Sequence, residues 1–392
     1  MTEFHPNKLG LISTILQSNV DKKSKPDEPA VELCNYTDVY YNDTITTDLD
    51  FMKATASPDQ IVRLRLAEGD VIITKDSETA DDIGIPAYVD STHDSLVCGY
   101  HLTVLRAHSG KVFPKFLYYL MLSRETSEYW EKRANGVTRV SIPQQTVSSL
   151  PISLPDLETQ RCIADYLDKE ISEMDALIEE FEGLVGSLRY RKKRFVEFEF
   201  QKSERWNLVP QRLKLLVDSE DNRRVPIDSG DRKDIQGEYP YYGASGVIDY
   251  VNDYIWDNEK RLLVSEDGAN LAMRNHPIAF VADGQYWVNN HAHVLKPRHN
   301  YPAELLAAAI EISPIHHLIT GSAQPKLTAF NMGEIAFPFP KDTDSAISMN
   351  VFIQEELSRM DALIEESTKL IENLKARKTA LITEVVTGRK EV

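Results

Sequence analysis

The side chains that could support metal or acid–base chemistry lie between positions 266 and 293. The run Asn289–His293 reads Asn-Asn-His-Ala-His, and two histidines could bind a divalent metal ion in a nuclease site. Glu266–Asp267, with His276, could take part in acid–base chemistry. However, His291 and His293 alternate along a predicted strand without a second ligand cluster, and no nucleophile accompanies the acidic pair. We therefore expect a polar strand end here, with a metal-dependent nuclease as an alternative.

Other catalytic signatures are missing from the sequence. There is neither a G-x-x-x-x-G-K-[ST] phosphate loop nor a G-x-G-x-x-G run after a strand. The segment Tyr239–Tyr242 lacks the amide and the second proline of the Asn/Asp-Pro-Pro-aromatic run that an adenine methyltransferase would carry. Cys34, Cys98 and Cys162 are far apart, so their spacing indicates neither a disulfide framework nor a metal site. We expect no catalytic residue and no bound metal in this chain.

Two polar loops contain side chains that could contact bases and phosphates. Arg and Lys suit guanine O6 and N7, whereas Asn and Gln suit adenine N6 and N7, because these pairs can form two hydrogen bonds. The candidates are Asn135, Thr138, Arg139, Gln144 and Gln145 in residues 134–145, and Ser322, Gln324 and Lys326 in residues 320–328. Ordinary turns also have this composition, so base recognition and a plain turn both stay open.

The elements that must position these loops occur twice. The run Met-Asp-Ala-Leu-Ile-Glu-Glu is identical at Met174–Glu180 and Met360–Glu366, an offset of 186. Further matches pair residues 170–192 with 356–378, 136–155 with 321–340 at an offset of 185, and 70–76 with 261–267 and 97–107 with 288–298, both at 191. Each half is predicted to run strand, strand, helix, loop, short strand and long helix. Low identity outside the long helices indicates related modules with different targets.

The long helices are predicted from apolar residues spaced three and four apart. This 3.5-residue period is typical of helices wound around each other. The seam residues are Ile171, Met174, Ile178 and Phe181 in the first copy, and Leu357, Met360, Ile364 and Ile371 in the second. Leu177, Leu184, Leu363 and Leu370 are expected to widen the apolar face. The alternative is an amphipathic helix that lies on a globular domain, but the matching copy favours mutual pairing.

The net charge of −17 is concentrated in the predicted helices. Residues 156–185 carry a net charge of −8 and residues 342–372 carry −6. Since like charges repel, these acidic helices are expected to face proteins rather than DNA. Basic residues cluster at Arg189–Arg194 and again at Lys375–Lys378, either as a solvated face or as a contact with phosphate or a partner. No run of 18 apolar residues and no secretory signal appear, so we expect a cytoplasmic protein outside the membrane.

Several segments together resemble one protein family. Gly136–Pro155 followed by Leu157–Ala164 resembles the run G-x-T, apolar-Pro, Pro-x-x-E-x-Q-x-x-I-A. Matching patterns also occur at residues 239–246, 266–270, 288–294, 321–327 and 384–388. The family is the DNA specificity (S) subunit of type I restriction–modification enzymes. The chain departs from it at Thr159, where Glu is frequent, and at Lys341–Asp344, which has no equivalent of Gln160.

The resemblance implies an α+β fold with an internal pseudo-two-fold repeat. Two mixed α/β target-recognition domains (residues 1–155 and 204–340) would each precede a long helix (156–203 and 341–392). The helices would pair as an antiparallel coiled coil. It also implies a non-catalytic subunit that docks methyltransferase subunits and a restriction motor-nuclease subunit. S-adenosylmethionine, ATP and Mg would bind those partners, and no cofactor would bind this chain.

The resemblance further implies that each domain reads one half of a split double-stranded DNA site. Five further DNA-contact candidates join the loop residues: Lys75, Asn270, Arg274, Asn290 and His291. The alternative function is a coiled-coil scaffold that binds only proteins.

Overall fold

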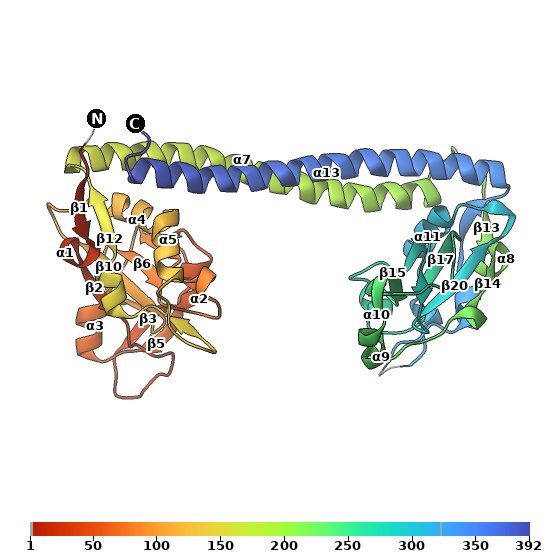
Figure 1. Ribbon diagram of the computed structural model, residues 1–392, viewed down its shortest axis with the longest axis horizontal. Coiled ribbons are helices and arrows are strands. Elements are labelled where there is room, and N and C mark those ends of the chain that lie inside the picture. Colours follow the sequence, from red (N-terminus) through yellow and green to blue (C-terminus); the bar gives the residue numbers. More distant parts are fainter. Residues whose placement is uncertain (1–2, 322–323) are drawn as a thin grey trace. The chain divides into compact units, whose positions relative to one another are not determined.

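A computed structural model describes residues 3–321 and 324–392. The chain forms two compact units: unit 1 comprises Met1–Glu182 with Thr368–Val392, and unit 2 comprises Gly183–Ser367. Each unit contains a globular part of strands and short helices (Figure 1). Each also contains one part of α7 (Leu157–Gln201) and one part of α13 (Thr343–Val386). This arrangement confirms the expected α+β class with a long helix after each globular part.

Unit 1 is built around a five-stranded sheet with the order β2-β10-β6-β8-β4. Its strands are Ser13–Gln17, Leu102–Ala107, Val71–Thr74, Pro86–Val89 and Thr44–Ile45. A second sheet joins β5 (Met52–Thr55), β3 (Ala30–Cys34) and β9 (Leu96–Cys98), and two-stranded pairs join β1 (His5–Lys8) to β12 (Pro151–Leu154) and β7 (Asp76–Ser77) to β11 (Val140–Ser141). The helices are α1 (Leu9–Ile12), α2 (Tyr36–Tyr40), α3 (Pro58–Leu64), α4 (Pro114–Leu122), α5 (Arg124–Glu131) and α6 (Gln144–Ser148), with a 3-10 turn at Ala80–Asp82.

Unit 2 repeats this plan with a four-stranded sheet in the order β14-β20-β17-β18. Its strands are Val217–Ser219, Ala292–Pro297, Arg261–Ser265 and Ala279–Ala282. A three-stranded sheet joins β16 (Gly246–Val251), β15 (Gln236–Gly243) and β19 (Trp287–Val288), and β13 (Leu208–Arg212) pairs with β21 (Ala336–Pro340). The helices are α8 (Leu213–Leu216), α9 (Ser229–Asp234), α10 (Asn270–Met273), α11 (Ala303–Glu311) and α12 (Ala329–Gly333), with 3-10 turns at Asp221–Arg223, Arg298–Asn300 and His316–Leu318.

Strand β6 lies between two apolar cores, which explains why its sequence is apolar without alternation. Val71 and Ile73 belong to the core that includes α4, whereas Ile72 belongs to the core that includes β3. Because successive side chains point to opposite faces of a sheet, a strand with a core on each face needs apolar residues at every position. The same holds for β17, where Leu262 and Leu263 belong to different cores.

Strand registers define how the two halves correspond. Leu102 of β10 pairs with Thr74, and Ala292 of β20 pairs with Ser265. The offset is therefore 191 for the β6 and β17 residues but 190 for the β10 and β20 residues. Over these strands, the sequence alignment of 97–107 with 288–298 at 191 was thus wrong by one residue. A one-residue slip matters because it moves every side chain to the opposite face of the sheet.

A pair of short helices packs in the same way in both units. In unit 1 the Leu9 backbone N–H donates to the Leu150 carbonyl, which brings α1 beside α6. A Cβ added to Gly10 would lie 3.0 Å from the Ser148 Cβ, so α1 approaches α6 closely at this glycine. In unit 2 the tight contact lies between α8 and α12, and the glycine is on the opposite helix: a Cβ on Gly333 would lie 3.2 Å from the Lys214 Cβ.

The two long helices begin with matching caps. The Asp156 carboxylate accepts the backbone N–H groups of Glu158 and Thr159, both at 3.0 Å. At the equivalent position, Asp342 accepts the Ser345 N–H at 2.9 Å. Backbone hydrogen bonds from the first turn lower the pKa of both carboxyl groups. Each acidic cap satisfies helix N–H groups that have no partner within the helix, so it determines where the long helix starts.

Within each unit the helices run antiparallel. In unit 1, Lys378 donates to Asp175 at 2.8 Å and Lys375 donates to Glu182 at 3.0 Å, so rising numbers in α7 meet falling numbers in α13. In unit 2, Lys192 pairs with Asp361. The contacts of Asp175 with Lys378 and of Asp361 with Lys192 are equivalent at the offset of 186. This reciprocity confirms the expected antiparallel pairing of repeated helices.

Candidate nucleic-acid interface

The first polar loop is closed by backbone pairing between Asn135 and Ser141. Their N–H and C=O groups exchange two hydrogen bonds, at 3.0 and 2.9 Å. Gly136 has a φ of +148°, and a Cβ there would overlap the Arg139 carbonyl oxygen, so the turn requires glycine. The residues between the closing pair, including Thr138 and Arg139, are exposed except for a half-buried residue at 140.

The second polar loop is closed in the same way between Thr320 and Lys326. The two backbone hydrogen bonds measure 2.8 and 2.7 Å, and Gly321 takes a φ of +82° at the position of the first loop's glycine. Gln324 is exposed. Ser322, also expected at this loop, lies outside the described residues. The loops that sequence alignment paired at an offset of 185 are therefore closed by the same backbone pairing, with a glycine directly after its first residue.

Both loops rest on the same backbone positions of their sheets. In unit 1 the Lys75 N–H donates to the His101 carbonyl, and the Lys75 carbonyl accepts the Ile142 N–H. In unit 2, Glu266 stands in the place of Lys75 and bonds to His291 and Leu327 in the same pattern. Each loop is therefore anchored by backbone hydrogen bonds at the end of a sheet strand.

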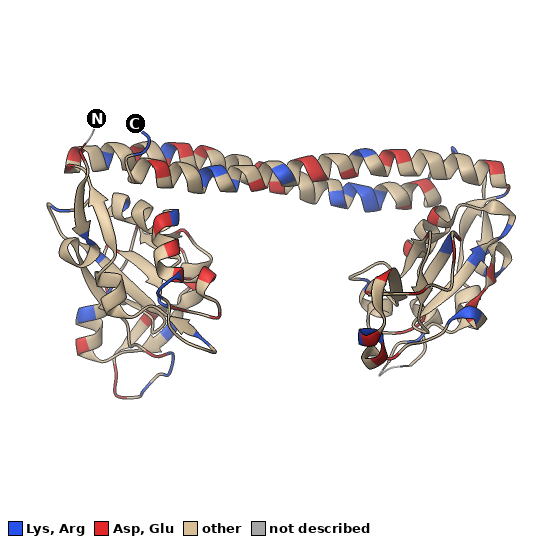
Figure 2. Cartoon of the chain, in the orientation of Figure 1, with Lys and Arg blue, Asp and Glu red and all other residues tan. Residues whose placement is uncertain are grey.

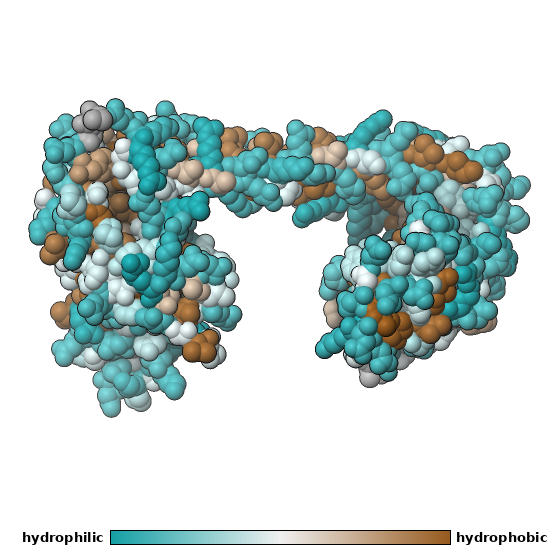
Figure 3. Space-filling view, viewed as in Figure 1, coloured by the Kyte–Doolittle hydropathy of each residue, from teal (hydrophilic) through white to brown (hydrophobic). Residues whose placement is uncertain are grey.

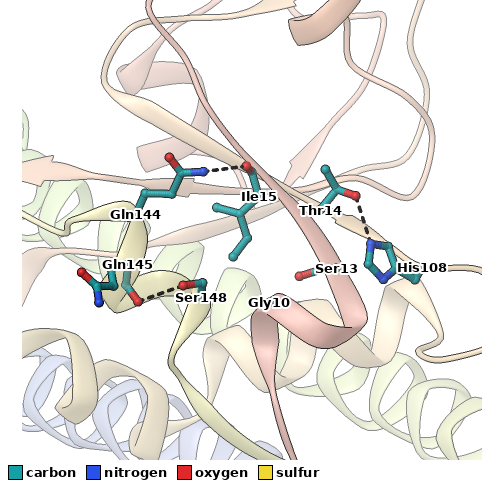
Figure 4. Close-up of a pocket in the computed structure, with 8 residues that line it drawn as sticks. All are labelled: Gly10, Ser13, Thr14, Ile15, His108, Gln144, Gln145 and Ser148. Carbon is teal, nitrogen blue, oxygen red and sulfur yellow. Dashed lines mark hydrogen bonds between the residues drawn. The ribbon is translucent and has the colours of Figure 1, made fainter.

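Some predicted contact residues in unit 1 also make side-chain contacts within the fold. The Lys75 Nζ donates to the Ser18 carbonyl at 3.2 Å and lies 4.4 Å from the Tyr100 ring centroid. The exposed Gln144 donates through Nε2 to the Ile15 carbonyl at 3.1 Å, as Figure 4 shows. Both side chains therefore have partners within the protein. Their contacts with DNA remain predictions.

An open pocket of about 540 Å³ lies beside Gln144 in unit 1. Gln145, also a predicted contact residue, is exposed at its wall (Figure 4). On the facing side, Thr14 and His108 share a hydrogen bond of 3.0 Å. The pocket is polar and shallow, and it extends the exposed polar surface next to the first loop.

In unit 2, Asn270 and Arg274 make structural contacts. Asn270 exchanges two hydrogen bonds with the His276 backbone, both at 2.9 Å. The Arg274 guanidinium donates to the Glu311 carbonyl at 2.6 Å and to the Ser313 carbonyl at 2.9 Å. Burial lowers the pKa of Arg274, in spite of the nearby charge of Glu311. The side chains of Asn270 and Arg274 thus both bind backbone groups of unit 2. Their contacts with DNA remain predictions.

Asn290 and His291 are both exposed at the start of β20. The His291 Nδ1 lies 2.8 Å from an Asp267 carboxylate oxygen. Asp267 also forms a backbone bridge with Lys326, so this histidine lies at the base of the second loop. Asn290 is its neighbour in sequence, so both exposed residues lie near this loop.

His293 belongs to a buried ion network that sequence reasoning missed. Its Nδ1 lies 2.6 Å from the Asp221 carboxylate, and its Nε2 lies 2.9 Å from the Leu327 carbonyl. Both partners only accept hydrogen bonds, so both ring nitrogens donate and the ring is an imidazolium. Burial by itself would lower the pKa of His293, but the hydrogen bond and the charge of Asp221 outweigh it, and the pKa is raised.

The network corrects the expectation that no ligand cluster accompanies this histidine. Ligand atoms of Asp221, Glu266 and His293 lie within 4.8 Å of one another. However, both nitrogens of His293 donate hydrogen bonds, so neither presents a lone pair to a metal ion. Glu266 also pairs with Arg224 at 2.7 Å and with Lys326 at 3.1 Å. The cluster therefore anchors the second loop through Lys326 and its neighbour Leu327.

Most predicted seam residues are buried in the helix pair. Ile171, Met174 and Ile178 are less than a tenth exposed, as are Met360 and Ile371, whereas Phe181, Leu357 and Ile364 are half-buried. Leu177, Leu184, Leu363 and Leu370 do not extend the buried face, because each is 39–49% exposed. Hydrophobic side chains accordingly interrupt the hydrophilic surface of the helices in Figure 3.

Acidic and basic residues are interspersed along both helices (Figure 2). Lys192, Lys375 and Lys378 of the two basic clusters form ion pairs with carboxylates of the neighbouring helix. Arg194 pairs with Glu197 on its own helix. Part of each basic cluster therefore serves helix pairing. Among the described residues, no helix is both long and apolar enough to cross a membrane.

Comparison with known proteins agrees with this geometry. The family model for the type I restriction modification DNA specificity domain matches twice, at residues 15–181 and 209–376. The chain is 29% identical over 205 residues to the type I restriction enzyme HindI specificity subunit of Haemophilus influenzae. This alignment covers 51% of the chain and 42% of that relative, so the chain matches less than half of the relative's length.

Solved structures share the fold over almost the whole chain. One comes from a study of complex assembly and conformational transition in the type I restriction–modification system, with a TM-score of 0.75, 14% identity and full coverage of both chains. The HsdS subunit from Thermoanaerobacter tengcongensis gives a TM-score of 0.54 at 14% identity, covering 99% of this chain and 97% of that one. The family model matches twice, and each match contains a polar loop closed by backbone hydrogen bonds and the start of a long helix. The chain therefore belongs to the type I restriction modification DNA specificity domain family.

Proposed function

We propose that this chain is the non-catalytic specificity subunit of a type I restriction–modification complex and reads a split double-stranded DNA site. Each globular part would read one half of the site. The observation that carries this proposal is the pair of loops, Asn135–Ser141 and Thr320–Lys326, which have the same backbone closure but different side chains. A common scaffold with different reading groups suits two half-sites of different sequence.

The exposed groups of each loop suit base edges. In the first loop Arg139 offers a planar pair of donors that matches the O6 and N7 acceptors of guanine. In the second loop the Gln324 amide can both donate to and accept from adenine, and the Lys326 ammonium suits guanine or phosphate. Lys326 also forms an ion pair with Glu266, so its ammonium group would have to leave this carboxylate to contact DNA.

The surface of the helix pair supports the docking of methyltransferase subunits. Leu177 and Leu184 are exposed seven residues apart on α7, and Leu363 and Leu370 repeat this spacing on α13. Exposed leucines at heptad spacing on acidic helices suit the apolar and basic surfaces of other helices. In the proposed complex, which would act in the cytoplasm, methyltransferase and motor-nuclease partners would bind S-adenosylmethionine, ATP and Mg.

The proposal is tested by sequencing the methylated sites of a host that expresses this chain with its methyltransferase subunit. We expect one motif with two specified parts and an unspecified spacer. Arg139→Ala should relax one part and Gln324→Ala the other, because each lost base contact removes about 1–3 kcal/mol of discrimination. Each variant is the control for the other, since the two loops are closed by the same backbone pairing.

Three results would contradict this function. If either variant relaxed both parts of the motif, independent reading of half-sites would be wrong. If the complex bound DNA without sequence preference, the protein-only scaffold would be favoured. If the purified chain, free of partner subunits, methylated DNA or cut it with a divalent ion, the chain would itself be an enzyme.

A further inference from the structure

A histidine–aspartate pair occurs at the same place in both units. The His101 Nδ1 lies 2.8 Å from an Asp76 carboxylate oxygen in unit 1. The His291 Nδ1 lies 2.8 Å from an Asp267 carboxylate oxygen in unit 2. His101 was not among the candidates predicted from sequence, because the alignment at an offset of 191 placed Ala292 opposite it.

Backbone contacts make the two pairs equivalent. The His101 carbonyl accepts the N–H of the residue before Asp76, and the His291 carbonyl accepts the N–H of the residue before Asp267. Asp76 then pairs with Ser141 in a short ladder, whereas Asp267 bridges Lys326. These two partners are the last residues of the two closed loops. Each pair therefore lies directly under the end of a recognition loop.

The side chains around the pairs differ, although the pairs themselves do not. Tyr100 precedes the histidine in unit 1, whereas the exposed Asn290 precedes it in unit 2. The loops end in Ser141 and Lys326. The histidine–aspartate pair is the same in both units, whereas the side chains expected to contact bases differ. Such a pair suits a feature of DNA that all half-sites have in common. That feature is the sugar–phosphate backbone, since phosphate contacts carry no sequence information.

The geometry leaves one nitrogen of each ring for a ligand. The carboxylate only accepts, so Nδ1 carries the hydrogen and the aspartate fixes the orientation of the ring. Among the residues that the structure describes, the Nε2 atoms of His101 and His291 have no hydrogen-bond partner. The His101 side chain is 29% exposed and the His291 side chain 46%, against 15% for Asp76 and 16% for Asp267. The rings are therefore accessible and their anchors are sheltered.

We infer that His101 and His291 each donate a hydrogen bond through Nε2 to a DNA phosphate beside the half-site read by the neighbouring loop. The ring is an imidazolium in the complex, because Nδ1–H donates to the aspartate and Nε2–H to the phosphate. Asp76 and Asp267 act as positioning residues. This inference rests on the proposed function, because it requires that the loops bind DNA.

Substitution by Asn and Gln separates the two ring nitrogens. Asn places its amide nitrogen near the position of Nδ1, so His101→Asn keeps a donor for Asp76 and loses the outward donor. Gln places its amide nitrogen near the position of Nε2, so His101→Gln keeps the outward donor and loses the inward one. His291→Asn and His291→Gln form the matched set in the other unit. Circular dichroism of each variant checks that the chain is folded.

The measurement is the dissociation constant for DNA of the complex that this chain forms with methyltransferase subunits. It is measured on DNA with the motif identified by methylation sequencing and on DNA with both half-sites scrambled. We expect each Asn variant to bind about threefold to tenfold more weakly, the effect of one lost hydrogen bond, and by the same factor on both DNAs. Each Gln variant should keep most of the affinity. The double Asn variant should show the product of the two losses.

Three outcomes overturn the inference. Asn variants that bind like the wild type would show that the outward nitrogen is not used. Gln variants as weak as Asn variants would show that the histidine acts only through its aspartate. A loss confined to the cognate motif would show base reading instead of a phosphate contact. A wild-type complex without preference for the motif would instead refute the proposed function, so the two failures can be told apart.

Discussion

Replacing His293 by Leu tests the buried ion network of unit 2. The side chain is 2% exposed and connects the Asp221 carboxylate to the Leu327 carbonyl. Leucine fills a similar volume but donates no hydrogen bond. The variant therefore leaves a largely buried carboxylate without its histidine partner and a backbone carbonyl without its donor.

The expected loss of stability is about 3 kcal/mol. Removing one partner of a buried ion pair costs about 3–5 kcal/mol because the other charge is left uncompensated. The lower end applies here, since Asp221 also accepts the Val294 N–H at 2.8 Å and lies 3.5 Å from Arg224. The Leu327 carbonyl loses its side-chain donor, but the added burial of apolar surface offsets part of that cost.

The control is His291→Leu, two residues earlier in the sequence. That histidine is 46% exposed in its pair with Asp267, so solvent screening limits the loss to less than about 1 kcal/mol. The assay is urea unfolding followed by tryptophan fluorescence, which reports mainly on unit 2 because three of the four tryptophans belong to it.

The pH dependence gives a second readout. The folded-state pKa of His293 is raised above its usual 6.5, so the network contributes fully below that pH and is lost as pH rises through the folded pKa. The urea midpoint of the wild-type protein should therefore decrease as pH rises above about 6.5, and His293→Leu should lose this part of the pH dependence. Equal losses for the two Leu variants, or a variant that keeps the full wild-type pH dependence, would refute the reasoning.

Two further predictions concern unit 1. Gly84 and Gly110 have φ values of +77° and +78°, but only a Cβ on Gly84 would meet an indole ring, whereas nothing lies within 4 Å of one on Gly110. In thermal unfolding, Gly110→Ala should cost about 1–2 kcal/mol for the left-handed conformation, and Gly84→Ala about 1–3 kcal/mol more from overpacking; equal costs would contradict the steric account. Asp175→Lys and Lys378→Asp should each destabilise the helix pair by less than about 1 kcal/mol, because the side chains are 45% and 20% exposed. Combining the two should restore stability, and an additive loss in the double variant would show that the ion pair makes no contribution.

The sequence alone predicted the elements whose signal is local or repeated. The two loops were matched because Gly136 and Gly321 hold the same place in an alignment at a constant offset, and backbone closure confirmed the match. The helix seam was visible because a 3.5-residue period persists over several turns. Antiparallel pairing agrees with the reciprocal contacts of Asp175 with Lys378 and of Asp361 with Lys192.

Contacts between distant residues could not be predicted in this way. The partner of His293 is Asp221, 72 positions earlier, and nothing in the pattern around either residue points to the other. Arg274 reads as an exposed cation, but the fold directs its guanidinium to two backbone carbonyls. The equivalence of His101 with His291 was missed by one residue, although the Val-Leu pairs that follow both histidines could have indicated the correct offset.

The glycine in the paired short helices restricts how this chain can be recombined with its relatives. Gly10 faces Ser148 in unit 1, whereas Lys214 faces Gly333 in unit 2, so the contact needs a glycine on one side but not on a particular side. Each arrangement is compatible only with its own partner. A chimaera whose breakpoint falls between the two helices could bring two side chains to this contact and strain it, for a reason unrelated to DNA. Exchanging residues 204–340 as one block moves Lys214 and Gly333 together and preserves the contact between α8 and α12. Selection should therefore favour crossovers that lie outside these two short helices.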